Sequence, residues 1–190
     1  MADSLRIVLL GAPGCGKGTQ AARLAGTLGI PAISTGDMLR AAVAAGSELG
    51  RRVEGVMASG ALVDDDLMAE VVRDRLSQPD AAAGFLLDGY PRTAPQAGTL
   101  EEILNGSQID HVVTIDVPDE ELVQRIVLRG RGADDREEVV RERLQVYAAQ
   151  TEPLIAHYEC LGLLRRVNGN VPIEQVTAAI EASLAGTASA

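Results

Sequence analysis

The sequence predicts an α/β fold in which helices cover both faces of a five-stranded parallel sheet, a three-layer α/β/α arrangement. Three observations lead to this prediction. Apolar runs of strand length alternate with segments of helical periodicity along the 190 residues. The first apolar run leads through a glycine-rich turn into a helix-forming segment. The core must be aliphatic, because the chain has one Phe, three Tyr and no Trp.

The apolar runs are the predicted strands. They are short and separated by helical segments, as parallel strands joined by right-handed crossovers require. In chain order they cover residues 5–10, 31–34, 85–88, 111–117 and 163–167.

The intervening segments are the predicted helices, at residues 17–28, 35–45, 49–59, 65–76, 95–104, 119–128, 136–158 and 172–184. The interval between the second and third strands is too long for one crossover, so we expect a small helical insertion there. Insertions that overhang the carboxyl ends of parallel strands are common places for ligand sites. The glycine- and aspartate-rich residues 130–135 predict a short flexible joint.

Composition limits the possible partners. The length suits one domain, and the net charge of −10 argues against nucleic acid or an anionic membrane as a partner. Cys15 and Cys160 do not form a disulfide framework or a four-thiolate zinc site, so we expect free thiols. Neither a signal peptide nor a membrane-spanning run is apparent, which makes the cytoplasm the expected location.

Residues 11–19, Gly-Ala-Pro-Gly-Cys-Gly-Lys-Gly-Thr, predict a phosphate-binding loop. Backbone N–H groups in such a strand–turn–helix segment converge on one place, and the helix N-terminus adds positive potential. Lys17 is the only lysine of the chain, and its compact ammonium suits the outer phosphates of a nucleotide. The hydroxyl of Thr19 follows Gly18 and could hold Mg²⁺ directly or through water.

Three further segments are candidates for function. Asp88 ends an apolar strand, where a carboxylate can order magnesium-bound water, although Asp-Gly also simply forms turns. Ser34 and Thr35 either cap a helix or belong to a site that includes Arg40. The last segment carries arginines, some at helical spacing, that either contact a ligand or form surface ion pairs with the interleaved acidic residues: Arg125, Arg129, Arg131, Arg136, Arg141 and Arg143.

Together these segments resemble the adenylate kinases of the short-lid type, within the nucleoside-monophosphate kinases. The resemblance runs from about Leu5 to Leu184, and its most specific parts are residues 11–19, 34–40, 88–93 and 141–144. It implies a P-loop NTPase-type fold in a single domain, residues 1–190. The core would comprise residues 1–33, 64–129 and 137–190, with a monophosphate-binding insertion at 34–63 and a short lid at 130–136.

The resemblance also implies an activity and its residues. The reaction would be reversible, Mg²⁺-dependent, direct in-line transfer, ATP + AMP = 2 ADP, serving nucleotide homeostasis. The implied ATP-binding residues are Gly14, Cys15, Gly16, Lys17, Gly18, Thr19, Arg125, Arg129 and Val171. The implied AMP-binding residues are Thr35, Arg40, Ala61, Leu62, Val63, Gly89, Tyr90, Pro91, Arg92, Gln96, Arg131 and Arg143. The implied catalytic residues are Lys17, Arg40, Asp88, Arg92, Arg129, Arg131 and Arg143, with Thr19 and Asp88 near Mg²⁺, directly or through water.

The chain departs from the family pattern in its lid and at the adenine site. Gly132 stands where the family usually has arginine, so Arg131 is assigned to that role with a one-residue slip. Val171 replaces the lysine or glycine that often meets the ATP adenine, so only its backbone could do so. The lid lacks the cysteines of a zinc knuckle. The resemblance also suggests a cis Tyr90–Pro91 bond.

Two alternatives remain at this point. A UMP/CMP kinase is one, although Thr35 favours AMP because pyrimidine-specific relatives tend to have alanine there. The other is a catalytically silent nucleotide-binding regulator, against which the second set of phosphate-binding arginines argues. In either case, small-molecule nucleotides are the expected partners, and a monomer is the expected assembly.

Overall fold

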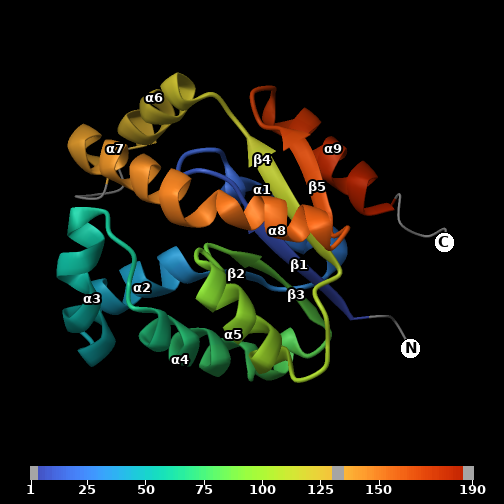
Figure 1. The fold of residues 1–190 in the computed structure, drawn as a ribbon, viewed down its shortest axis with the longest axis horizontal. Coiled ribbons are helices and arrows are strands. Elements are labelled where there is room, and N and C mark those ends of the chain that lie inside the picture. The colour runs from blue at the N-terminus through green and yellow to red at the C-terminus, as the bar shows by residue number, and fades with distance from the viewer. Residues whose placement is uncertain (1–3, 130–134, 186–190) are drawn as a thin grey trace.

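The computed structural model describes residues 4–129 and 135–185, and within them a five-stranded sheet forms the centre of the molecule (Figure 1). All strand pairs are parallel, and the order is β2-β3-β1-β4-β5. This confirms the predicted fold class. The strands are β1 Leu5–Leu10, β2 Ala32–Ser34, β3 Gly84–Asp88, β4 His111–Asp116 and β5 Leu164–Asn168.

Helices connect the strands in the predicted order, mostly with the predicted bounds. They are α1 Lys17–Leu28, α2 Thr35–Ala44, α3 Glu48–Ser59, α4 Asp65–Leu76, α5 Ala94–Leu104, α6 Asp119–Arg129, α7 Glu137–Val146, α8 Pro153–Cys160 and α9 Ile173–Ala185. A short 3₁₀ turn, Pro79–Ala81, precedes β3 and was not predicted.

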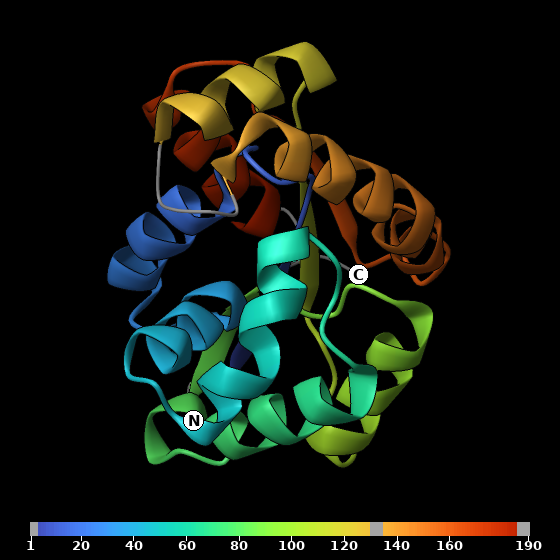
Figure 2. The same ribbon diagram turned by 90° about the vertical axis from the view of Figure 1, so that its left-hand side faces the viewer.

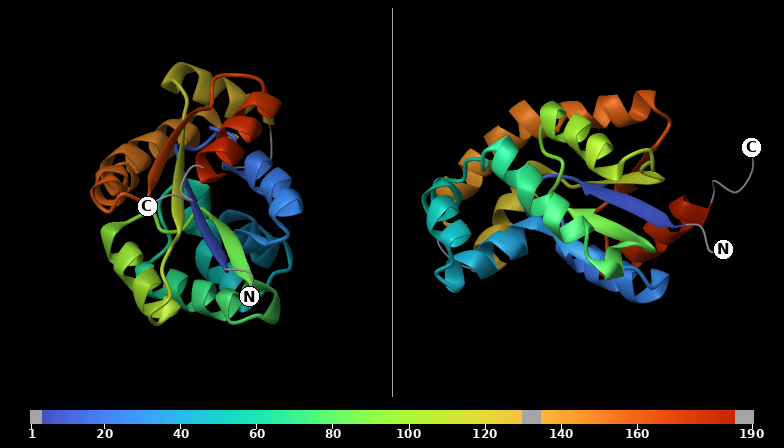
Figure 3. Two further views of the ribbon diagram at one scale, coloured as in Figure 1. Left: turned by 90° about the vertical axis from the view of Figure 1, so that its right-hand side faces the viewer. Right: turned by 90° about the horizontal axis from the view of Figure 1, so that it is seen from below.

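The sheet is buried on both faces because alternate side chains of its central strand enter two different cores. Ile7 and Leu9 of β1 pack in the core beneath α1 and α9. Val8 and Leu10 pack in the other core, beneath α5 and α8. Figure 3 shows these helix pairs on opposite sides of the sheet. A strand buried on both faces needs a continuous apolar sequence, as β1 has.

The structure corrects one predicted helix. Residues 136–158 were expected to form a single helix, but α7 and α8 are separated by a π-helical turn, Tyr147–Thr151. Pro153 is the cause, because it has no N–H to continue the α-helical ladder and its ring crowds the preceding turn. The Glu152 N–H instead donates to the Tyr147 carbonyl, one residue further back than in an α-helix.

The segment between β2 and α4 extends beyond the carboxyl end of the sheet (Figures 1 and 2). There α2 and α3 pack closely, and Gly50 of α3 lies against the backbone of Ala42, so that a Cβ at this position would collide with it. The proposed division of the chain into core, insertion and lid stays a prediction. Residues 130–134 of the predicted lid lie outside the described residues. Within the described ranges, the helices are all too short or too polar to cross a membrane.

The buried imidazole of His111 predicts a pH dependence of the stability of the fold. It opens β4, and among the described residues its buried Nδ1 atom has no hydrogen-bond partner. Burial, and then repulsion by Arg165, lower the pKa of His111 below its usual value, with Asp110 opposing the shift.

We therefore expect the free energy of unfolding to fall as the pH drops below about 6.5, since the unfolded chain then binds a proton that the folded chain disfavours. Urea unfolding of the wild type and of His111→Gln between pH 8 and 5 measures this dependence. His157→Gln is the control, because His157 is exposed. The same pH dependence in the His111 variant as in the wild type would contradict the assignment.

Candidate active site

The carboxyl ends of β1, β2 and β3 lie together at one edge of the sheet. Leu9 pairs with Asp88, and Ser34 pairs with Asp88 from the other side. Parallel strands end at the same edge, so the loops after Leu10, Ser34 and Asp88 meet there. The segments singled out in the sequence are thereby brought together, although they are far apart along the chain.

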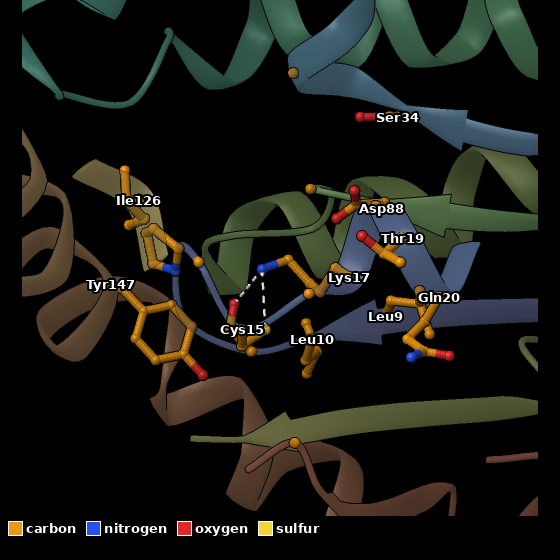
Figure 4. A pocket seen from close by; sticks show the side chains of 18 of the residues that line it. Leu9, Leu10, Cys15, Lys17, Thr19, Gln20, Ser34, Asp88, Ile126 and Tyr147 are labelled. Carbon is orange, nitrogen blue, oxygen red and sulfur yellow. Dashed lines mark hydrogen bonds between the residues drawn. The ribbon is translucent and has the colours of Figure 1, made fainter. Parts of the chain in front are cut away.

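A cavity of ≈ 440 Å³ lies at this edge (Figure 4). Most of the predicted ATP-binding residues line it, together with the predicted metal-ordering carboxylate: Gly14, Cys15, Gly16, Lys17, Gly18, Thr19, Arg125, Val171 and Asp88. The remaining predicted residue of this set, Arg129, ends α6, and its side chain lies outside the described part of the structure.

The loop before α1 has a backbone that only glycine adopts easily. Gly14 and Gly16 have φ values of 86° and 102°. Gly16 is the N-cap residue of α1, and it offers no side chain to the first N–H groups of the helix. Those N–H groups are therefore available to an anion in the cavity, and the helix dipole favours negative charge there.

Lys17 folds back over this loop (Figure 4). Its Nζ atom donates to the carbonyl oxygens of Gly11 at 2.6 Å and Ala12 at 3.0 Å. The Cys15 sulfur lies 3.7 Å from the same nitrogen and is buried, with 3% of the residue exposed. The ammonium is thus held at the cavity wall by carbonyl oxygens of the loop.

Arg125 forms another wall of the same cavity. Its Nε atom donates to Glu121 at 2.9 Å, and its terminal nitrogens donate to the Gly169 carbonyl and to Asn170 Oδ1, both at 3.1 Å. These three partners hold the guanidinium plane in place, and Val171 lines the same cavity. A fixed planar cation can stack on a base, which suits a chain so poor in aromatic residues.

A smaller cavity of ≈ 60 Å³ adjoins the first, and Arg92 and Arg143 line both. Predicted AMP-binding residues line it, namely Thr35, Arg40, Ala61, Leu62, Val63, Gly89, Arg92, Gln96 and Arg143. Its apolar lining also includes Leu39, Met57 and Met68. The cavity therefore has a basic part next to the larger cavity and an apolar part.

Hydrogen bonds order the polar groups around the smaller cavity. Thr35 Oγ1 donates to the Gly89 carbonyl at 2.9 Å, and Arg92 Nε donates to the same carbonyl at 2.8 Å. Arg40 pairs with Asp37 at 2.7 Å. Arg143 lies 3.8 Å from the buried carboxylate of Asp135. Burial first, then repulsion by Arg143 and Arg40, lower the pKa of Arg92, while Asp88 opposes this shift.

The match to known proteins agrees with this geometry. The family model described as adenylate kinase matches residues 9–163. Among similar proteins, adenylate kinase 1 of Synechocystis sp. is 49% identical over 95% of this chain and 97% of its own length. Adenylate kinases of Stenotrophomonas maltophilia and Xanthomonas euvesicatoria pv. vesicatoria are 50% and 51% identical, over 96% and 95% of this chain and 100% and 99% of their own lengths.

The chain belongs to the adenylate kinase family. This confirms the predicted family and enzyme class, a nucleoside-monophosphate kinase. The Tyr90–Pro91 peptide bond is cis, as the resemblance suggested.

The oxygen donors near the phosphate loop fit the Mg²⁺ that the adenylate kinase family implies. The Asp88 carboxylate lies by Gly18, since a Cβ placed there would be 3.8 Å from Oδ2, and Thr19 lines the same cavity. Hard oxygen ligands in small number suit Mg²⁺, which keeps several waters and binds substrate phosphates. Among the described residues, no three His, Cys, Asp or Glu side chains could together hold a metal ion.

Several predicted residues lie elsewhere or remain without a described position. Tyr90 is buried and lines neither cavity, whereas Pro91 lines the larger one. Arg131 lies outside the described residues. Ser34 caps α2, because its side chain accepts from the Asp37 N–H, and it also lines the larger cavity (Figure 4). Arg141 forms an exposed ion pair with Glu137, which is the surface alternative considered for the arginine cluster.

The π-helical turn contributes two residues to the site that were not predicted. Tyr147 and Thr151 line the larger cavity, and Thr151 Oγ1 donates to the Arg92 carbonyl at 2.8 Å. This hydrogen bond connects the backbone of Arg92, which lines both cavities, to the π-helical turn. Pro153 was the available signal, because a proline inside a long helical pattern marks an interruption, and π turns occur often at functional sites.

The phosphate loop yields a prediction with an internal control. Ala in place of Gly14 or Gly16 should strain a positive-φ backbone by about 1–2 kcal/mol. Only at Gly14 would the new Cβ also meet α6, at 2.7 Å from Ile126 Cγ1, whereas nothing lies within 4 Å at Gly16. We expect Gly14→Ala to lose about 1–3 kcal/mol more stability than Gly16→Ala in urea unfolding. Equal losses would contradict the described packing of α6 on the loop.

Proposed function

We propose that this chain transfers a phosphoryl group reversibly between ATP–Mg²⁺ and AMP, giving two ADP, by direct in-line transfer without a covalent intermediate. Family membership supports this proposal. The observation that carries it is the meeting of two cavities at Arg92 and Arg143. A second phosphate-binding pocket next to the first is what a kinase acting on a nucleotide needs, and a protein that only senses one nucleotide does not need it.

In this proposal, ATP occupies the larger cavity. The loop N–H groups at residues 14–19 bind its phosphates, and Lys17 follows the transferred group as it moves. The adenine lies along the guanidinium plane of Arg125, next to Val171. By resemblance, Arg129 and Arg131 close over the phosphates.

AMP occupies the smaller cavity, with its phosphate toward the larger one. Arg40, Arg92 and Arg143 bind that phosphate, and the aliphatic and methionine side chains hold the base. Thr35, the backbone at residues 61–63, Gly89 and Gln96 complete the pocket. Since Arg92 and Arg143 border both cavities, the donor and acceptor phosphates meet among cations.

The chemistry needs little beyond position and positive charge. The nucleophile is a phosphate oxygen that is already anionic, so no general base is required. Fixed cations stabilise the charge that spreads over the transferring group. Water would compete as an acceptor, so we expect the segments flanking the two cavities to close over bound nucleotides.

Mg²⁺ is the proposed cofactor, and when bound it neutralises charge on the ATP phosphates. Asp88 and Thr19 would hold it through oxygen atoms, directly or through water. The resemblance further favours a monomer in the cytoplasm that maintains the balance of adenine nucleotides.

An acceptor assay tests the proposal. With ATP–Mg²⁺ as donor, we expect AMP to be preferred over CMP, UMP and GMP. We also expect ADP alone to be converted into ATP and AMP. A clear preference for CMP or UMP would identify a pyrimidine-specific kinase instead. ATP binding without any ADP conversion would identify a catalytically silent regulator.

Lys17→Met should fold as the wild type does but lose several orders of magnitude in turnover, because it removes a cation that acts in the transition state. The initial rate of ADP conversion and the thermal unfolding midpoint measure the two effects separately. A variant that keeps most of its activity would disprove the role of Lys17.

A further inference from the structure

Gln96 brings a side-chain amide to the wall of the smaller cavity. It lies in the first turn of α5, it is 2% exposed, and it lines the cavity together with Leu39, Met57 and Met68. A buried amide among apolar side chains has few other groups to satisfy it. The atoms that it presents to a ligand therefore depend on how its protein partners orient it.

Two partners fix that orientation. The Arg92 N–H donates to Gln96 Oε1 at 2.8 Å, and Gln96 Nε2 donates to Asp65 Oδ1 at 2.7 Å. A peptide N–H can only donate, and a carboxylate can only accept. If the amide were rotated by half a turn, N–H would face N–H and oxygen would face carboxylate. Only one orientation satisfies both partners.

Asp65 is itself held in place. It is the first residue of α4, and its second oxygen accepts from Thr93 Oγ1 at 3.1 Å. Thr93 in turn is the N-cap of α5 and accepts from the Gln96 N–H at 3.2 Å. The chain of bonds from α4 through Thr93 to Gln96 makes the amide part of the rigid framework.

A fixed amide discriminates between bases in a way that a rotating amide does not. After its two protein bonds, Gln96 retains one lone pair on Oε1 and one N–H on Nε2. An adenine edge offers the complementary pair, a 6-amino donor and the N1 acceptor. A 6-oxopurine offers these groups in the reverse order, with an oxygen at position 6 and N1–H. A freely rotating amide could turn to match either base.

We propose that Asp65 is a positioning residue that sets the acceptor preference of the enzyme. By fixing the Gln96 amide, it favours a monophosphate with an amino group at position 6 over its 6-oxo counterpart. This inference rests on the proposed function, because it assumes that the base of the acceptor nucleotide lies in the smaller cavity.

AMP and IMP provide the sharpest test, because they differ only at positions 6 and 1 of the purine. With saturating ATP–Mg²⁺, kcat/KM is measured for both acceptors in the wild type and in Asp65→Ala. We expect the wild type to prefer AMP, and the AMP/IMP ratio to fall about tenfold in the variant, because the Arg92 N–H alone then opposes rotation of the amide toward the orientation that suits IMP. KM for ATP should stay the same.

Asp66→Ala is the matched control. Asp66 also carries a negative charge in the first turn of α4, but it is exposed and forms no side-chain bond to Gln96. We expect its AMP/IMP ratio to equal that of the wild type. Asp65→Asn is a second variant that fills the same space and keeps one acceptor oxygen, so we expect an intermediate ratio. It serves as the test if Asp65→Ala does not fold.

The outcomes separate this inference from the proposed function. An AMP/IMP ratio that stays unchanged in the Asp65 variants, with or without an equal loss of kcat/KM for both acceptors, would overturn the inference, because Asp65 would then only stabilise the helices. A wild type that uses IMP as well as AMP would also overturn it. A wild type that phosphorylates no nucleoside monophosphate would instead disprove the proposed function.

Discussion

The parallel pairing of β1 with β3 is the constraint on which the rest of the structure depends. In this register Leu9 lies opposite Asp88, so the phosphate loop and the loop after β3 leave the sheet side by side. The phosphate loop supplies N–H groups and a lysine, the last residue of β3 supplies the Asp88 carboxylate, and the loop after β3 supplies Arg92. Because β2 adds on the far side of β3, the start of α2 joins the same edge. The two cavities are thus a consequence of strand order, and the long interval before β3 is the segment that extends over them.

The proposed binding of polyphosphates depends on local charge. The chain carries a net charge of −10, so the overall field does not attract a polyphosphate. The attraction must come from local groups, namely Lys17, the N–H groups of the phosphate loop and the cluster formed by Arg92, Arg143 and Arg40. Burial, and then repulsion by Arg143 and Arg40, lower the pKa of Arg92, which means that the fold holds these three cations together at a cost. Phosphates bound between them would offset this cost. A cluster that is unfavourable by itself and favourable with two phosphate groups is the arrangement that a phosphoryl-transfer enzyme needs.

Local sequence patterns predicted the elements well, and contacts between distant segments were beyond them. Buried strands such as β1 are continuous apolar runs, and the glycines before α1 mark a turn, so both features can be predicted from the sequence alone. The order of the strands in the sheet cannot be predicted from local sequence patterns, since it depends on packing across the sheet. For the same reason the bond between Asp65 and Gln96 had no signal in the sequence. The prediction of a single helix over residues 136–158 was wrong, because helical periodicity continues across the segment although Pro153 interrupts the α-helical hydrogen bonds.

Binding of a molecule that spans both cavities tests the central claim most directly. Two adenosines joined by five phosphates would place one base in each cavity and the phosphates among the shared arginines. Isothermal titration calorimetry of the wild type should give one molecule bound per chain. We expect an affinity at least about 100-fold higher than that of ATP, because the second half binds without a separate association step. An affinity no higher than that of ATP would contradict the account, since it would mean that the two cavities are not occupied together.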